Sequence, residues 1–357
     1  MHMRILYGLC SWGLGHATRS LPIIRALVGD GHRVTVYTCD RALAVVRRQM
    51  GTQCEYIRGV GYPVPYVRGQ HGFVAKFTSF LPLIANAVRL EHRDVRRIVD
   101  ERNIDIIVGD GKYGLFHDRV PSYFVAHQLR LIAPGRLTIL ELITEYFQYR
   151  FHKKFRRYIV PDYEHNSLSG NLSHNLRLFD DNQIVYIGIL SEFRKENLPL
   201  DIDYFISVSG PEPSRTTFEK QVLAQVNNLG GRVIAALGKP EKSEVVRREN
   251  VEIHSYVDGK EGSRFMNRAK LVISRSGYST LMDLAELGKK ALLIPTPGQT
   301  EQEYLARYHQ ERGAFCCVPQ RTMDLKRDTE LAAQYPGVTY PQGTSYSVKK
   351  FMETIFG

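Results

Sequence analysis

The chain has 357 residues, 43% of them hydrophobic and 24% charged, which is typical of a globular protein long enough for two α/β cores. It has no apolar run of about 18 residues, so composition argues against a transmembrane helix, and the N-terminal stretch is typical of a first β-strand and not of a secretory signal. The five cysteines lack CxxC spacing, which argues against structural zinc and a disulfide framework and predicts a reducing cytoplasm.

The net charge of +11 is concentrated in the first half of the chain. Residues 1–190 contain 25 Lys and Arg against 16 Asp and Glu, hence +9, whereas residues 191–357 contain 23 against 21, hence +2. Such a surface can serve anionic lipid, nucleic acid, a phosphorylated acceptor or solubility alone. No zinc-finger spacing, basic zipper or aromatic RNA-binding motif accompanies it, so we expect no nucleic-acid partner.

The first half predicts strands that alternate with helices. RILYGLC predicts a strand, GLGHATRS a turn, LPIIRALVGDG a helix and HRVTVYTC a second strand, which together imply a parallel sheet. Later strands are expected at 104–111 and 121–128, and helices at 73–97 and 136–158. The second helix has a basic, aromatic end, for which both ordinary packing and a membrane-surface role remain open.

The second half repeats this pattern after a boundary near residues 185–201. We therefore predict the α/β class with two Rossmann-like domains, 1–190 and 191–357, and a last helix near 345–357 that could pack back on the first domain. Ligands of open parallel sheets bind beyond the carboxyl ends of the strands, so the candidate residues lie on the loops that follow them.

A glycine loop is the first candidate site. Gly13 and Gly15 would let the backbone approach a ligand, and the helix start that follows favours negative charge. The loop is not GxGxxG, so a dinucleotide site is disfavoured. His16 stands at the strand-to-helix turn as a candidate general base, which Asp110 at the end of a buried strand could orient. Taken singly, each is equally well explained as a surface or capping residue.

Two further motifs lie in the second half. In SRSGYSTLMD, Ser276 and Gly277 offer phosphate contacts, and Asp283 could accept hydrogen bonds from ribose hydroxyls. In PTPGQTEQEY, Gln302 and Glu303 could bind sugar hydroxyls, although acidic residues at a helix start also favour the helix dipole.

In this order, the three motifs resemble those of the family 28 glycosyltransferases, and the resemblance covers nearly the whole chain. The motif order is similar to that of the bacterial members that transfer N-acetylglucosamine to lipid I, and of uncharacterised bacterial and archaeal relatives that share GLGHATRS, YIG-LS and SGPEP. The resemblance implies the GT-B fold, in which the first domain binds the acceptor and the second binds the nucleotide sugar.

The resemblance also implies roles for single residues. Ser209 and Gly210 would contact the diphosphate, with Arg215 compensating for the amide donors that two nearby prolines remove. Tyr256 and Val257 would read the uracil. Asp283 replaces a ribose-binding Glu, and Gln302 with Glu303 replaces a Gln-Gln pair, so the transferred sugar stays open. The segment AHQLRLIAPG resembles a segment of the family's acceptor domain, which would place His127 and Gln128 beside the acceptor.

The reaction implied is an inverting transfer from a UDP-sugar substrate, without cofactor or metal, in which His16 and Asp110 resemble the His–Asp pair of plant-type enzymes. Asp201 and Asp203 bracket one residue in the manner of a metal-binding motif but fall at the domain linker. The acceptor is expected to be lipid-linked or otherwise anionic, at the inner face of the cytoplasmic membrane. A nucleotide-sugar epimerase or hydrolase and a non-catalytic nucleotide-sugar-binding protein remain as alternatives.

Overall fold

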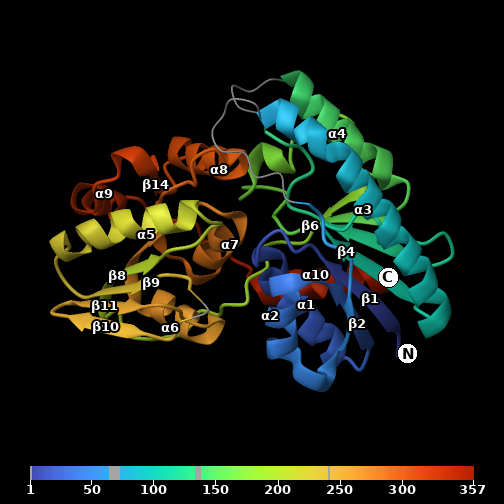
Figure 1. Ribbon diagram of the computed structural model, residues 1–357, viewed down its shortest axis with the longest axis horizontal. Helices are drawn as coiled ribbons and strands as arrows, with labels where there is room; N and C mark the ends of the chain where they lie inside the picture. The colour runs from blue at the N-terminus through green and yellow to red at the C-terminus, as the bar shows by residue number, and fades with distance from the viewer. Residues whose placement is uncertain (1, 64–72, 133–137, 240–241) are drawn as a thin grey trace. The chain divides into compact units, whose positions relative to one another are not determined.

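The structure is a computed structural model that describes residues 2–63, 73–132, 138–239 and 242–357 (Figure 1). The chain forms two compact units: unit 1 comprises Met1–Glu192 and Gln342–Gly357, and unit 2 comprises Phe193–Pro341. The sequence suggested a boundary after residue 190 and a last helix that could pack back on the first domain. The chain does return after Pro341, and the last helix belongs to unit 1.

Unit 1 contains a seven-stranded sheet of order β3-β2-β1-β4-β5-β6-β7, in which all neighbouring strands are parallel. Its central strands β4 and β5 are buried along their whole length because helices cover both faces of the sheet (Figure 1). The strands are β1 (Arg4–Leu9), β2 (Arg33–Thr38), β3 (Glu55–Arg58), β4 (Ile106–Asp110), β5 (Ser122–Val125), β6 (Arg157–Val160) and β7 (Ile184–Tyr186).

The helices of unit 1 bury apolar stripes on this sheet. Leu21, Ile24 and Leu27 of the first helix are fully buried at helical spacing. The last helix is held by Tyr123, whose hydroxyl donates to Ile355 O at 3.2 Å, and by Thr344, whose Oγ1 accepts from Ser191 N at 2.9 Å. The helices are α1 (Gly15–Gly29), α2 (Asp40–Met50), α3 (Phe73–Arg102), α4 (Thr138–His152) and α10 (Thr344–Phe356).

The sequence suggested one helix over residues 136–158, but the structure contains a helix and a strand there. Residues 133–137 lie outside the described part, α4 ends at His152, and β6 begins at Arg157. Tyr158 and Ile159 pair with Phe124 and Val125 of β5, so the apolar end of the segment is a strand buried in the sheet.

Unit 2 repeats the architecture with a sheet of order β10-β11-β9-β8-β12-β13-β14, parallel except for the β10–β11 pair. Helices α5 and α6 lie on opposite faces of this sheet (Figure 1). The strands are β8 (Ile202–Ser207), β9 (Val233–Ala236), β10 (Val245–Arg248), β11 (Val251–His254), β12 (Ala269–Ser274), β13 (Lys290–Leu293) and β14 (Cys316–Cys317). The helices are α5 (Ser214–Gln225), α6 (Gly259–Arg268), α7 (Tyr278–Leu287), α8 (Thr300–Glu311) and α9 (Leu325–Ala332). Among the described residues of both units, none of the helices is long and apolar enough to cross a membrane.

Candidate active site

The register of the first sheet brings three loops to one edge. Leu9 at the end of β1 pairs with Asp110 at the end of β4, and Asp110 pairs with Val125 at the end of β5. Asp110 is the last residue of β4, His16 lies at the start of the helix that follows β1, and His127 lies in the loop that follows β5. Parallel pairing therefore gathers residues that are far apart in the sequence, as parallel sheets do at their carboxyl edge.

Asp110 is the buried centre of this cluster. Its carboxylate accepts hydrogen bonds from Arg19 Nε at 2.9 Å and from Ser20 Oγ at 2.9 Å, forms an ion pair with Arg19 Nη2, and lies 2.8 Å from His16 Nδ1. Burial alone would raise the pKa of Asp110, but the charge of Arg19 and the contact with His16 outweigh burial and hold that pKa well below its usual range. Asp110 is therefore a fixed negative charge.

His16 lies at the start of α1, with a side chain that is 19% exposed. Burial lowers the pKa of His16 below 6.5, and the neighbouring Arg19 lowers it further, against the raising effect of Asp110. The imidazole is thus neutral at neutral pH. His16 Nδ1 lies 2.8 Å from Asp110 Oδ1 and 2.9 Å from Arg19 Nη2. In the tautomer that has its proton on Nδ1, this proton is directed at the Asp110 carboxylate and Nε2 is the basic nitrogen.

The pattern-based reading missed Arg19, the cation that joins these residues. The side chain is 2% exposed, and its Nη1 lies 2.7 Å from His127 Nδ1. Because a guanidinium only donates, a hydrogen bond between these two atoms requires His127 Nδ1 to accept. The available signal was its position three residues after His16, on the same face of α1. Gln128 lies half-buried beside His127.

The glycine loop leaves the start of α1 open. Gly13 is exposed with a φ of +109°, Gly15 is the first residue of α1, and the first turn contains no acidic residue and no side-chain cap. Gly111 is equally constrained, because its φ is +66° and a Cβ there would lie 3.0 Å from His16 Cε1. The edge thus combines accessible backbone with a closely packed histidine.

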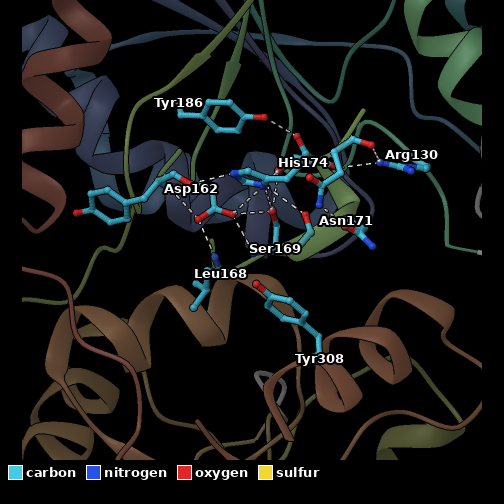
Figure 2. A network of polar contacts seen from close by, with 12 residues as sticks. Arg130, Asp162, Leu168, Ser169, Asn171, His174, Tyr186 and Tyr308 are labelled. Carbon is cyan, nitrogen blue, oxygen red and sulfur yellow. Dashed lines mark hydrogen bonds and ion pairs between the residues drawn. The ribbon is translucent and has the colours of Figure 1, made fainter. Parts of the chain in front are cut away.

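A polar cluster around Asp162 and His174 contacts Arg130, which lies in the loop that follows β5 (Figure 2). The buried Asp162 accepts from the backbone N–H groups of Leu168 at 2.9 Å and Ser169 at 2.8 Å, and from Ser169 Oγ at 2.6 Å. The loop that it organises presents the carbonyl of Leu172 to Leu129 N at 2.8 Å. The contacts of Asp162 hold residues 162–169 in place, and the bond from Leu129 N to Leu172 O connects this segment to the loop that follows β5. The cluster is therefore a scaffold for that loop.

In unit 2, the proposed diphosphate loop follows β8. Ser209 and Gly210 are exposed, Gly210 has a φ of +120°, and α5 begins at Ser214 without a side-chain cap or an acidic first turn. Arg215, expected to contact phosphate, instead pairs with Glu212 and, at 2.9 Å, with Glu219. Its charge is therefore already balanced by two carboxylates.

The second and third motifs meet at the start of α7. Ser276 Oγ donates to Gln302 O at 2.8 Å, and a Cβ on Gly277 would lie 3.7 Å from Gln302 Nε2. Gln302 Oε1 accepts from Thr296 N at 2.9 Å, and Glu303 Oε1 accepts from Gly298 N at 2.8 Å. Both side chains thus shape the preceding turn, and the amide N–H groups of Gln302 face the glycine.

The other predicted donor residues lie on neighbouring elements. Asp283 is half-buried on α7, six residues after its N-cap Gly277. Tyr256 and Val257 are half-buried in the turn between β11 and α6, which Asp258 closes as the N-cap by accepting from Glu261 N at 2.9 Å. The donor positions predicted in unit 2 thus fall on loops or helix starts at the carboxyl edge of the second sheet, except Asp283, which is one turn deeper. The two further donor positions, Gly13 and Gly15, lie in the glycine loop of unit 1.

Asp201 and Asp203 are occupied by cations. Asp201 pairs with Arg268 and, at 2.8 Å, with Arg232, and Asp203 pairs with Lys270 at 2.8 Å. Within the described ranges there is also no group of three or more His, Cys, Asp or Glu side chains arranged to hold a metal ion.

Comparisons with known proteins agree with this arrangement. Residues 214–335 match the glycosyltransferase family 28 C-terminal domain, and residues 3–131 match glycosyl transferase family 1. An uncharacterized glycosyltransferase of Methanosarcina mazei is 23% identical over 336 residues, which cover 87% of this chain and 84% of the relative. The UDP-N-acetylglucosamine–N-acetylmuramyl-(pentapeptide) pyrophosphoryl-undecaprenol N-acetylglucosamine transferase of Anaplasma marginale is 20% identical, with 87% and 84% covered.

The same fold occurs in the crystal structure of Acinetobacter baumannii MurG. The two chains align with a TM-score of 0.57 at 12% identity, over 100% of this chain and 99% of the other. The two parallel sheets, the match of unit 2 to the family 28 domain and the similarity along both units lead to one identification: the chain is a glycosyltransferase of the GT-B fold, and its second unit is similar to the family 28 C-terminal domain.

Proposed function

We propose that the chain is an inverting, metal-independent glycosyltransferase that moves a sugar from a UDP-sugar to a hydroxyl of a lipid-linked or other anionic acceptor. The observation that carries this proposal is the contact of 2.8 Å between His16 Nδ1 and the buried carboxylate of Asp110. A neutral imidazole held by a carboxylate is the arrangement that general-base catalysis requires.

The reaction follows from that pair. Nε2 of His16 removes the proton of the acceptor hydroxyl while the oxygen attacks the anomeric carbon. The bond from that carbon to the diphosphate oxygen breaks on the opposite side, so the configuration inverts and UDP leaves as an anion. Asp110 stabilises the imidazolium and remains ionised.

The leaving diphosphate would be stabilised by backbone dipoles instead of a metal ion. Helices α5 and α7 both begin without an acidic residue in the first turn and without a side-chain cap, so their N–H groups are available to an anion. Asp201 and Asp203, which have the spacing of a metal-binding motif, are engaged by arginine and lysine.

A membrane-bound acceptor is supported by α4, which exposes apolar side chains and buries acidic ones. Its outward residues are apolar, with Ile139 74%, Ile143 56% and Tyr146 53% exposed, whereas Glu141 and Glu145 are buried. The turn that follows α4 presents four exposed basic residues: Lys153, Lys154, Arg156 and Arg157. An apolar stripe beside basic residues suits a surface of anionic lipid, and we propose peripheral contact with the inner face of the cytoplasmic membrane.

The donor is tested by incubating the protein with a panel of nucleotide sugars and following both the melting temperature and the release of free nucleotide. We expect a UDP-sugar to stabilise the protein most, and nucleotide release to require an acceptor. Absence of stabilisation by any UDP or TDP species would overturn the proposal. Conversion of the donor to a new sugar without acceptor would instead identify an epimerase.

A further inference from the structure

Unit 2 contains a buried arginine that none of the predicted roles uses. Arg275 follows the last residue of β12 and is 1% exposed, which makes it the largest fully buried side chain of the described residues. Its Nη1 donates to the carbonyls of Ile294 at 3.1 Å and Pro295 at 3.2 Å, and its Nη2 donates to Ser214 O at 3.3 Å. Its Cζ lies 4.0 Å from the centre of the Phe218 ring.

These partners are neutral, so the charge of Arg275 is not balanced. No carboxylate among the described residues pairs with it, and its Nε is buried without a hydrogen-bond partner. Buried cations of unit 1 differ, because Lys112 pairs with Glu91 at 2.7 Å and Arg19 pairs with Asp110. Burial lowers the pKa of Arg275 to about 10, so the guanidinium remains charged at neutral pH. An unpaired buried charge is costly unless an anion approaches it.

Arg275 also joins the three segments that carry the predicted donor residues. Ser214 begins α5 after the loop of Gly210, Arg275 itself precedes Ser276, and Pro295 opens the turn before α8. A second unsatisfied group lies in the same place: Thr296 Oγ1 is buried without a partner, 3.8 Å from where a Cβ on Gly210 would be. Two unsatisfied polar groups and two uncapped helix starts thus converge where a diphosphate would lie.

We propose that Arg275, and not Arg215, is the positive charge that makes this edge selective for a nucleoside diphosphate over a nucleoside or a nucleoside monophosphate. Arg275 is a positioning residue in this account: it fixes the three loops and supplies the field, and the backbone amides and hydroxyls make the contacts. The inference rests on the proposed donor function and adds to it the residue that recognises the charge of the leaving group.

The test compares uridine, UMP and UDP as ligands of the full chain, by calorimetric titration at fixed ionic strength. We expect the ratio of the UDP to the uridine association constant to fall by about tenfold or more in Arg275→Gln, which keeps a hydrogen-bonding side chain without its charge. Arg275→Lys keeps the charge and should retain most of the ratio. Equal weakening of uridine and UDP in Arg275→Gln would mean a merely structural role and would overturn the inference.

Lys289, which directly precedes β13, provides a matched control. It is also largely buried, and its Nζ donates to the carbonyls of Asn267 and, at 3.0 Å, Ala269, at the opposite edge of the sheet. Lys289→Met should lower stability and leave the UDP-to-uridine ratio unchanged. A loss of the ratio equal to that of Arg275→Gln would show that any buried cation of unit 2 has this effect, which contradicts a local role.

Inorganic pyrophosphate keeps this test separate from the donor assignment, because it carries the charge without a base. If wild-type protein is stabilised by pyrophosphate and the gain disappears in Arg275→Gln, the inference stands even where uridine ligands fail to bind and the UDP-sugar proposal falls. If UDP binds and Arg275→Gln retains the full pyrophosphate gain, the donor stands and the inference fails.

Discussion

At the scale of single residues, Asp110 determines what the edge of the first sheet can do. Its carboxylate contacts Arg19, Ser20 and His16, so a base, a cation and a hydroxyl are fixed by one buried anion. The arrangement keeps His16 neutral while holding a negative charge beside it. This is the condition under which an imidazole can take up a proton during the reaction without already carrying one.

His16→Ala should lower kcat by about 10²- to 10⁴-fold, because the acceptor hydroxyl loses its general base. The binding of UDP, measured by titration, should change little, since the donor side chains that we propose lie in unit 2. Thr18→Ala, three positions before Leu21 on the same helix and half-buried, is a control for local packing. Unchanged turnover in His16→Ala would refute this mechanism while leaving the family assignment intact.

Arg19→Gln should move the acid limb of the pH profile. His16 must be unprotonated to act, so kcat/KM rises with pH through the pKa of His16, which burial and Arg19 hold below 6.5. Removing the Arg19 charge removes one of the lowering causes, so the limb should shift to higher pH. A limb that stays in place, measured over pH 5 to 8 in the range where histidine titrates, would show that another group controls it.

The sequence made part of this site predictable. His16 and Asp110 were accessible because apolar runs mark the ends of strands, and parallel pairing then brings those ends together. Arg19 and Arg275 were not, because an arginine in an amphipathic segment suggests a solvated side chain. Their burial depends on partners 91 residues away at Asp110 and 20 residues away at Pro295, which only the folded chain supplies.

At the scale of elements, α4 buries a side that its sequence pattern does not indicate. Its apolar residues recur at helical spacing, which normally marks the buried face, yet Ile139 and Ile143 are exposed and Glu145 is buried. The reason is local: Glu145 Oε1 accepts from Leu178 N at 2.7 Å, so the polar side of the helix is the one that the loop needs. The strand β6 that follows was not predicted, because Arg156 before it and Arg157 at its start look like the basic end of a helix.

The exposed face of α4 predicts binding to anionic lipid. Ile139→Ser combined with Ile143→Ser should reduce the fraction of protein that sediments with vesicles containing anionic lipid. Neutralising Lys153 and Lys154 should weaken the free energy of vesicle binding by about 1 kcal/mol per charge. Leu200→Ser, which removes a residue 54% exposed in unit 2, is the matched control. Binding that is indifferent to both sets of changes would mean that the acceptor is not presented by a membrane.

At the scale of the whole molecule, the chain crosses between the units twice, after Glu192 and after Pro341. The sequence indicated two α/β units and nearly the right first crossing, because the pattern of strands and helices restarts there. The sequence also indicated a last helix that could pack back on the first domain. It did not indicate the partners of that helix, because Tyr123 and Ser191 lie more than 150 residues earlier.

Phe351→Ala should therefore destabilise unit 1, although it lies near the end of the chain. Phe351 is fully buried on α10, and removing a buried aromatic side chain costs about 3–5 kcal/mol. Thermal unfolding followed with and without UDP should show a weakened transition for unit 1 and a retained gain from the ligand in unit 2. Loss of the UDP-dependent gain with unit 1 intact would contradict the assignment of α10.

The return of α10 also orders events during synthesis. Unit 2 is in effect an insertion within unit 1, and a ribosome makes all of Phe193–Pro341 before it makes the helix that completes the first sheet's cover. Until Gln342–Gly357 emerges, the nascent chain has an entire second unit able to fold while the hydroxyl of Tyr123 still lacks the carbonyl of Ile355. The unit that carries His16 begins first and is finished last.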